Sequence, residues 1–312
     1  SPRFIYLQDT AETSCPDFCE YEYESLLRGA SAEFEFQDFD ENTTATTFYT
    51  TGTTGDPKGV FYSHRQLVLH TMALVGGLAV PDSSSRVHLG DVYMPITPMF
   101  HVHAWGFPYA ATLLGLKQVY PERYDPALLL KLIESESVSF SHCVPTILQM
   151  LLSAPEAEQT DLSGWKVVIG GAALSQGLAR SAVQRGINLF TGYGMSETGP
   201  VATVADMGGV HEVDPDADLA GRCKTGKPMP LIDLRVVDAE MNDIPRGGSI
   251  SGEVVLRAPW LTQGYAGNPE GSEALWEGGY LHTGDVGYLD EGGSLLITDR
   301  MKDVIKSGGE WI

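Results

Sequence analysis

Residues 45–63 read Ala45-Thr46-Thr47-Phe48-Tyr49-Thr50-Thr51-Gly52-Thr53-Thr54-Gly55-Asp56-Pro57-Lys58-Gly59-Val60-Phe61-Tyr62-Ser63. The β-branched and aromatic run at 45–50 predicts a strand, and 60–63 predicts a second strand beyond a turn. Glycines in such a turn let backbone N–H groups face a ligand, while threonine hydroxyls and the Lys58 ammonium add donors and a positive charge. The pattern predicts a loop that holds an oligophosphate.

This loop differs from a Walker P-loop, which places glycine directly before its lysine and serine or threonine directly after. Here Pro57 precedes Lys58 and Gly59 follows it, so a P-loop nucleoside triphosphatase is disfavoured. A polar surface hairpin stays open as the alternative, because glycine-rich turns are common. A predicted helix at 64–75 after the second strand favours the phosphate-binding interpretation.

In the rest of the chain, predicted strands alternate with predicted helices. Strands are predicted at 93–97, 138–143, 166–169 and 187–190. Helices are predicted at 106–116, 126–134, 145–152 and 175–185. This alternation predicts an α/β fold with a parallel sheet and helices on both faces. From about residue 213, short segments separated by Gly, Pro and Asn predict a smaller, mostly antiparallel β-rich subdomain, barrel-like in character.

Composition narrows the classes of partner. Acidic residues outnumber basic ones, 41 to 20, and the formal net charge is -21. Such a surface repels phosphate backbones, so we expect no nucleic-acid partner. The four cysteines lack the spacing of a zinc site and indicate reduced thiols in a cytoplasmic protein. No apolar run reaches the length of a membrane span, which leaves only peripheral membrane contact open.

Further motifs follow the loop. They are Met99-Phe100-His101-Val102-His103-Ala104-Trp105, Gly170-Gly171-Ala172-Ala173, Thr191-Gly192-Tyr193-Gly194-Met195-Ser196-Glu197-Thr198, Gly252-Glu253-Val254-Val255-Leu256 with Gly264-Tyr265, His282-Thr283-Gly284-Asp285, and Asp299-Arg300-Met301-Lys302-Asp303-Val304-Ile305-Lys306-Ser307-Gly308-Gly309-Glu310. With them, residues 45–312 resemble the AMP-forming, adenylate-forming superfamily of acyl- and aryl-CoA synthetases, luciferases and peptide-synthetase adenylation domains. The motif at 99–105 and the ending at 306–312 are most similar to medium- and long-chain fatty acyl-CoA synthetases.

The resemblance implies the large N-terminal domain of the acyl-CoA synthetase fold. Its parts would be a remnant of the first α/β subdomain at 1–42, an α/β subdomain with the phosphate loop at 43–212, a β-rich subdomain at 213–298, and a hinge at 299–312. It also implies an AMP-forming acid–thiol ligase that uses ATP, Mg²⁺ and CoA. A fatty carboxylate would attack the α-phosphorus of ATP, pyrophosphate would leave, and CoA would take the acyl group from acyl-AMP.

The resemblance assigns the polyphosphate to the 50–58 loop. Thr50 and Lys58 join the catalytic set, and the phosphate contacts come from Thr51, Gly52, Thr53, Thr54 and Gly55. Glu197 matches the family glutamate that binds Mg²⁺, with help from Thr50 or Thr51, because this hard ion prefers oxygen ligands. The alternative for Ser196 and its neighbours is a purely structural role as a helix cap.

The adenosine contacts implied by the resemblance lie further along. Tyr193 would stack on adenine, Asp285 would accept hydrogen bonds from the ribose hydroxyls, and Arg300 would reach the ribose or α-phosphate. The remaining nucleotide contacts are Gly171, Ala172, Gly192, Gly194, Met195, Ser196 and Lys306. For Lys306, phosphate, CoA and solvent all stay open.

Three residues would serve the acyl group and the domain movement. His101 lies where the family places a residue beside the reacting carboxylate. Trp105 matches an aromatic gate of fatty acyl-CoA members, with simple core packing as an equal alternative. Lys302 matches the hinge about which a small C-terminal domain rotates.

Two departures from the family bear on activity. Ser196 stands where most members have threonine, which preserves the hydroxyl. The sequence begins abruptly and stops inside a motif, so we expect missing sequence on both sides, including the C-terminal domain that carries a catalytic lysine. For these 312 residues alone we expect ATP or acyl-AMP binding with weak or no turnover. Two alternatives remain: an aryl-CoA or other carboxylate–CoA ligase, and a nucleotide-binding protein without catalysis. Because members of the family often form homodimers, the resemblance leaves a homodimer open.

Overall fold

The computed structural model describes residues 3–8, 14–50, 57–83, 85–205 and 214–301, with the backbone of 306–307 and 310–311. The chain divides into two units, Ser1–Asp40 and Glu41–Ile312. In the first unit, β1 (Ile5–Tyr6) pairs in parallel with β2 (Tyr21–Glu22), and α1 (Tyr23–Gly29) follows. The Glu22 carboxylate caps α1 by accepting hydrogen bonds from the N–H groups of Glu24 and Ser25.

The second unit opens with the quoted segment, which folds into a hairpin followed by a helix. β3 (Thr44–Thr50) runs antiparallel to β4 (Lys58–Ser63), and α2 (His64–Leu78) begins directly after it. Ser63 and Gln66 form a reciprocal capping box that fixes where α2 starts. The predicted strand, strand and helix are therefore confirmed, whereas the loop residues 51–55 lie outside the described residues.

A seven-stranded sheet in the order β11-β10-β9-β8-β7-β5-β6 forms the centre of this unit. Its strands are β5 (Val92–Pro95), β6 (Lys117–Gln118), β7 (Phe140–Cys143), β8 (Lys166–Ile169), β9 (Asn188–Gly194), β10 (Val201–Val204) and β11 (Lys227–Pro228). The five strands β5, β6, β7, β8 and β9 pair in parallel. The parallel pairing confirms the prediction for β5, β7, β8 and β9, whereas β6 was not predicted. The remaining two, β10 and β11, are antiparallel additions at one edge.

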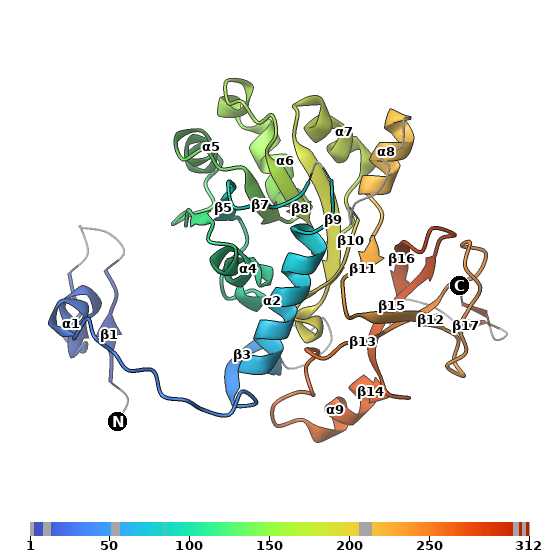
Figure 1. The fold of residues 1–312 in the computed structure, drawn as a ribbon, viewed down its shortest axis with the longest axis horizontal. Helices are drawn as coiled ribbons and strands as arrows, with labels where there is room; N and C mark the ends of the chain where they lie inside the picture. The colour runs from blue at the N-terminus through green and yellow to red at the C-terminus, as the bar shows by residue number, and fades with distance from the viewer. Residues whose placement is uncertain are drawn as a thin grey trace. The chain divides into compact units, whose positions relative to one another are not determined.

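Helices cover both faces of this sheet (Figure 1). They are α3 (Val102–Trp105), α4 (Phe107–Leu113), α5 (Pro126–Ser135), α6 (Pro145–Ser153), α7 (Gln176–Gln184) and α8 (Pro215–Arg222), with short 3-10 turns at Pro155–Glu158 and Ser196–Thr198. Val168 and Phe190 pack into a core with α2 and α4, whereas Val167 and Leu189 pack into a second core with α5, α6 and α7. Strands that are apolar on both sides require this double cover, which explains the confirmed α/β architecture.

The β-rich part is an antiparallel sheet in the order β12-β13-β15-β14, with β16 also pairing with β15. Its elements are β12 (Asp233–Val237), β13 (Gly252–Arg257), α9 (Pro269–Leu275), β14 (Trp276–Glu277), β15 (Tyr280–Leu289) and β16 (Leu295–Arg300). Val254, Leu256 and Leu281 share a core with Phe190 and Val204 of the large sheet. Beyond it, β17 (Lys306–Ser307) pairs with β18 (Glu310–Trp311).

The predicted helix at 106–116 begins later and ends sooner than expected, as α4. The turn before it, α3, is left-handed, with φ between 48° and 60° at all four residues from Val102 to Trp105. Non-glycine residues pay a steric cost in this region, so the packing around α3 must hold it in place. No pattern in the sequence predicts this left-handed turn.

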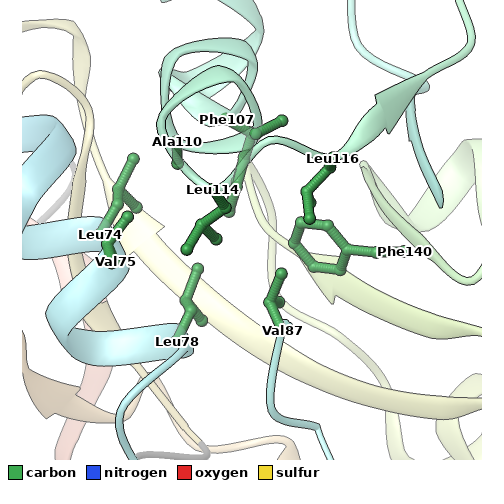
Figure 2. Close-up of a pocket in the computed structure, with 10 residues that line it drawn as sticks. Leu74, Val75, Leu78, Val87, Phe107, Ala110, Leu114, Leu116 and Phe140 are labelled. Carbon is green, nitrogen blue, oxygen red and sulfur yellow. The ribbon is translucent and has the colours of Figure 1, made fainter. Parts of the chain in front are cut away.

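A small cavity lies between α2, α4 and the sheet (Figure 2). Its lining is wholly apolar and consists of Leu74, Val75, Leu78, Val87, Phe107, Ala110, Ala111, Leu114, Leu116 and Phe140. Such a lining suits a hydrocarbon and offers nothing to an ion. Within the described residues, none of the helices combines the length and the apolar character needed to cross a membrane.

Candidate active site

The hairpin brings the two ends of the predicted phosphate loop together. Thr50 and Lys58 are directly paired at the end of the β3–β4 hairpin, which forms the mouth of the predicted phosphate site. Lys58 is exposed, and its ammonium lies 4.5 Å from the centre of the Tyr265 ring. A positive charge over an aromatic face is attracted by the ring. The hairpin thus fixes where the Lys58 charge stands.

Glu197 lies beside this mouth although it comes from a distant part of the chain. It sits in the Ser196–Thr198 turn after β9, and only 6% of its surface is exposed. The Tyr265 hydroxyl donates to Glu197 Oε1 at 2.7 Å. Burial, followed by the charge of Glu197, raises the pKa of Tyr265 well above its ordinary value, so this hydroxyl stays a donor at neutral pH.

The turn before Glu197 depends on glycine. A Cβ at Gly194 would collide with the carbonyl oxygen of Pro200 and approach the Thr198 side chain. Tyr62 of β4 donates its hydroxyl to the Ser196 carbonyl oxygen at 2.7 Å and so ties the turn to the hairpin. These contacts confine the backbone that carries Glu197.

The three residues expected at adenosine form one connected group. Tyr193 donates its hydroxyl to Asp285 Oδ2 at 2.7 Å, and Arg300 Nε lies 3.2 Å from Asp285 Oδ1. Arg300 and Asp285 are direct partners across β15 and β16. Burial, followed by the charge of Asp285, raises the pKa of Tyr193 well above its ordinary value, so its hydroxyl remains a donor.

The turn after β8 faces the end of β9. A Cβ at Gly170 would approach the Gly192 carbonyl oxygen and the Trp105 ring, and Gly171 has φ +76°. These glycines follow the carboxyl end of β8, and Tyr193 lies near the carboxyl end of the neighbouring parallel strand β9. That edge is where open α/β sheets bind ligands.

Trp105 is buried beside this turn. Its ring centre lies 4.9 Å from that of His142, whose ring stacks in turn on Phe107 at 4.7 Å. His142 Nε2 is 2.8 Å from the Tyr93 hydroxyl, whereas Nδ1 has no hydrogen-bond partner in the described structure. Phe107 also lines the apolar cavity of Figure 2. A row of three rings therefore joins the Gly170 turn to the cavity.

The structure separates the two histidines of the 99–105 motif. His103 Nε2 lies 2.9 Å from Thr46 Oγ1, and its ring contacts Phe48, so it ties the left-handed turn to the hairpin. His101 is exposed, and its recorded ring contact is with Phe100. Of the other expected residues, Lys302 lies outside the described residues, and for Lys306 only the backbone, in β17, is described.

The described residues contain no group of three or more His, Cys, Asp or Glu side chains that could enclose a metal ion. Glu197 offers a single carboxylate, and Tyr265 engages only its Oε1 among the described residues. Mg²⁺ commonly takes one or two carboxylates and completes its shell with substrate phosphates and water. The donor set therefore fits an ion that arrives with a nucleotide.

Comparison with known sequences agrees with this geometry. The profile of a family described as "AMP-binding enzyme" matches residues 5–266. The chain belongs to the AMP-binding enzyme family.

Two relatives of this chain are fatty-acid–CoA ligases, and others are ligases of other acids, such as 4-coumarate–CoA ligases. A long-chain-fatty-acid–CoA ligase of Thermus thermophilus is 45% identical over 270 residues, covering 85% of this chain and 49% of the relative. A medium-chain-fatty-acid–CoA ligase of Ectopseudomonas oleovorans is 39% identical over 295 residues, covering 93% and 53%. The chain thus spans about half the length of the curated relatives it matches.

The fold has a close counterpart among solved structures. The inhibitor-bound N-terminal domain of FACL13 from Mycobacterium tuberculosis superposes with a TM-score of 0.77 at 25% identity. The match covers 93% of this chain and 70% of that one. The architecture is therefore that of an acyl-CoA synthetase N-terminal domain.

Two tyrosines beside the Ser196–Glu197 turn have no role that the sequence alone predicts. Tyr265 was noticed only as part of the Gly264-Tyr265 motif, and Tyr62 only as part of a strand. Both donate hydroxyls to the Ser196–Glu197 turn. The signal available in the sequence was the placement of a tyrosine inside a family motif, which says nothing of its partner.

Proposed function

We propose that the complete protein activates a medium- or long-chain fatty acid in two steps. The carboxylate attacks the α-phosphorus of ATP and forms acyl-AMP, with pyrophosphate leaving. The CoA thiolate then attacks the acyl carbon, and AMP leaves. The observation that carries the proposal is the placement of Glu197 and Lys58 around Tyr265, in the same unit as the Tyr193–Asp285–Arg300 group.

The phosphate end of the site supplies charge and donors. Thr50, Lys58 and the loop between them, with Thr51, Gly52, Thr53, Thr54 and Gly55, hold the β- and γ-phosphates. Glu197, helped by Thr50 or Thr51, holds Mg²⁺, which when bound neutralises phosphate charge as pyrophosphate leaves. Phosphoryl-type displacements depend mainly on such positioning and charge stabilisation.

The adenosine end uses the connected group. Tyr193 stacks on adenine, Asp285 accepts hydrogen bonds from the ribose, and Arg300 reaches the ribose or α-phosphate. Gly194 has no side chain, so the nucleotide can approach the backbone at this position. The turn at Gly171 and Ala172 borders adenine and the acyl group. Gly192, Met195 and Ser196 complete this wall.

On the acyl side of the site, the fatty tail passes along the rings of Trp105, His142 and Phe107 to the apolar cavity. His101 stands beside the reacting carboxylate, and Trp105 gates the route. Because Trp105 is packed between Gly170 and His142, the tail must displace it to reach the cavity behind Phe107. The cavity measures only about 10 Å³, so a tail that enters must push its lining side chains apart, and that apolar lining favours an alkyl chain over a polar acid.

The remaining roles belong to the same proposal. Lys302 serves as hinge, and Lys306 contacts phosphate or CoA during thiol attack. Residues 43–212 and 213–298 act as the two subdomains, with 1–42 and 299–312 as parts of neighbouring ones. The protein works in the cytoplasm, where both ATP and CoA are present.

ATP–pyrophosphate exchange on the complete gene product tests the proposal. A fatty-acid series supports it if exchange peaks with medium or long chains. Exchange with an aromatic acid alone moves the enzyme to the aryl-CoA ligases, the alternative within the family. Absence of exchange with every acid, at normal ATP affinity, leaves a nucleotide-binding protein without catalysis.

A further inference from the structure

Tyr265 contacts both charged groups at the phosphate end of the site. Its hydroxyl donates to Glu197 Oε1 at 2.7 Å, and its ring carries the Lys58 ammonium 4.5 Å from the ring centre. The side chain is almost wholly buried, with 8% of its surface exposed. One side chain therefore contacts both a carboxylate and an ammonium.

The backbone of Tyr265 is held against the hairpin. Tyr265 forms an antiparallel bridge with Val60, and the next residue, Ala266, donates its N–H to the Gly59 carbonyl oxygen at 2.7 Å. The Tyr265 N–H donates to Ser272 Oγ at 2.8 Å. Because Gly59 and Val60 follow Lys58 directly in β4, the Tyr265 ring is fixed relative to the strand that carries the lysine.

The Glu197 turn is attached to the same segment. The Thr262 N–H donates to the Glu197 carbonyl oxygen at 3.1 Å, and Thr262 Oγ1 donates to the Phe61 carbonyl oxygen at 3.0 Å. Residues 262–266 thus join the hairpin and the Glu197 turn through the backbone. The Tyr265 side chain adds the contact that decides where the Glu197 carboxylate points.

We propose that Tyr265 is a positioning residue that holds Glu197 through Oε1, so that Oε2 would be available to Mg²⁺, and holds Lys58 apart from it, where its ammonium would be available to the nucleotide phosphates. The inference rests on the proposed function, since it concerns the same site. The Tyr265 hydroxyl positions the Glu197 carboxylate, whereas the Tyr265 ring positions the Lys58 ammonium. The two contributions can be removed separately.

Two substitutions make that separation. Tyr265→Phe removes the hydroxyl and keeps the ring, so the Mg²⁺ concentration needed for half-maximal ATP binding rises about tenfold, as expected for one lost hydrogen bond to a charged group. Metal-free ATP affinity stays within about threefold because Lys58 keeps its ring. Tyr265→Leu removes both, so metal-free ATP affinity also falls.

Tyr280 provides a matched control. Its hydroxyl donates to Asp233 Oδ2 at 2.7 Å, and its ring lies 5.1 Å from the Arg235 guanidinium and 4.9 Å from that of Arg257. It repeats the chemistry of Tyr265 at the first residue of β15, whereas Asp285 lies in the middle of that strand. Tyr280→Phe therefore loses a tyrosine–carboxylate hydrogen bond of the same kind at an exposed position and leaves the Mg²⁺ dependence unchanged.

The experiment is calorimetric titration of the complete protein with ATP at a series of Mg²⁺ concentrations, without acid or CoA. A selective shift of the Mg²⁺ dependence in Tyr265→Phe supports the proposal. An unchanged Mg²⁺ dependence in Tyr265→Phe, or an equal shift in Tyr280→Phe, overturns it. If Tyr265→Leu does not fold, the Phe variant alone decides. Failure of the wild-type protein to bind ATP in a Mg²⁺-dependent manner would instead refute the proposed function.

Discussion

Tyr193 and Asp285 join the two sheets through one hydrogen bond of 2.7 Å from the tyrosine hydroxyl to Oδ2. Tyr193 lies in β9 of the large sheet, and Asp285 lies in β15 of the antiparallel sheet. Asp285 is 6% exposed, so its carboxylate depends on protein donors rather than on water. The same contact therefore serves both stability and the proposed adenosine site.

Replacing Tyr193 separates these two uses. Tyr193→Phe lowers the free energy of unfolding by about 1–3 kcal/mol, because a buried carboxylate loses a donor. AMP affinity changes little, since the ring that stacks on adenine remains. Tyr193→Leu loses the stacking as well, and AMP binding weakens by a further ~1–3 kcal/mol. Urea denaturation and AMP titration measure the two quantities; equal AMP affinities in both variants would contradict the stacking role.

Gly194→Ala tests the close backbone approach in the Glu197 turn. The new Cβ would collide with the Pro200 carbonyl oxygen, so the turn must move and stability falls by about 3 kcal/mol or more. Gly177→Ala in α7 is the matched control, because a Cβ there meets nothing within 4 Å. Helix propensity predicts that this control is stabilised by up to about 1 kcal/mol. Thermal unfolding compares them, and similar losses in both would contradict the account of Gly194.

Acid lowers stability through the buried histidines. Burial lowers the pKa of His142 to about 3 and that of His70 to about 4. Since an unfolded histidine titrates near ~6.5, the unfolded chain binds more protons below that pH, and stability falls as pH drops toward 4. Each histidine contributes at most about 1.4 kcal/mol per pH unit.

His142→Gln removes one of these two titrations. The glutamine keeps a polar partner for the Tyr93 hydroxyl but cannot take up a proton. The free energy of unfolding, measured in urea at several pH values, should therefore fall less steeply below pH ~6.5 than in the wild-type protein. Above pH ~7 both proteins give flat curves and serve as their own control. Parallel curves throughout the acid range would be incompatible with a neutral, buried His142.

Filling the apolar cavity tests the route of the acyl chain. Ala110 lines the cavity on α4 (Figure 2), and Ala110→Leu places a branched side chain there. Exchange with palmitic acid should fall by about tenfold or more relative to hexanoic acid, because the tail loses its space. Exchange with hexanoic acid is the internal control for folding. A uniform loss across the acids would mean that the cavity lies off the acyl route.

Sequence reasoning reached the architecture because its signals are local. Continuous apolar runs such as 166–169 indicate strands that are buried on both faces, and the period of amphipathic helices such as 126–134 depends only on which face is buried. The hairpin at 44–63 was predicted from β-branched residues and a glycine turn. The antiparallel β10 and β11 were not, since pairing direction depends on the course of the whole chain.

The candidate site could be predicted only in part, because sequence patterns are local. Motifs identified Glu197, Tyr193 and Asp285 one by one, but their contacts join residues that are far apart in sequence. The link from Tyr265 to Glu197 spans such a distance, as does the link from His103 to Thr46. The left-handed turn at Val102–Trp105 is enforced by tertiary packing against intrinsic preference.

The most direct test of the central claim is acid-dependent ATP–pyrophosphate exchange by the complete protein, measured for wild type and Glu197→Gln. The account predicts exchange that needs a medium- or long-chain fatty acid and falls by about 100-fold or more in the variant, because charge stabilisation at the leaving pyrophosphate is lost. Undiminished exchange in Glu197→Gln, or no exchange by the wild type with any fatty acid, would contradict it.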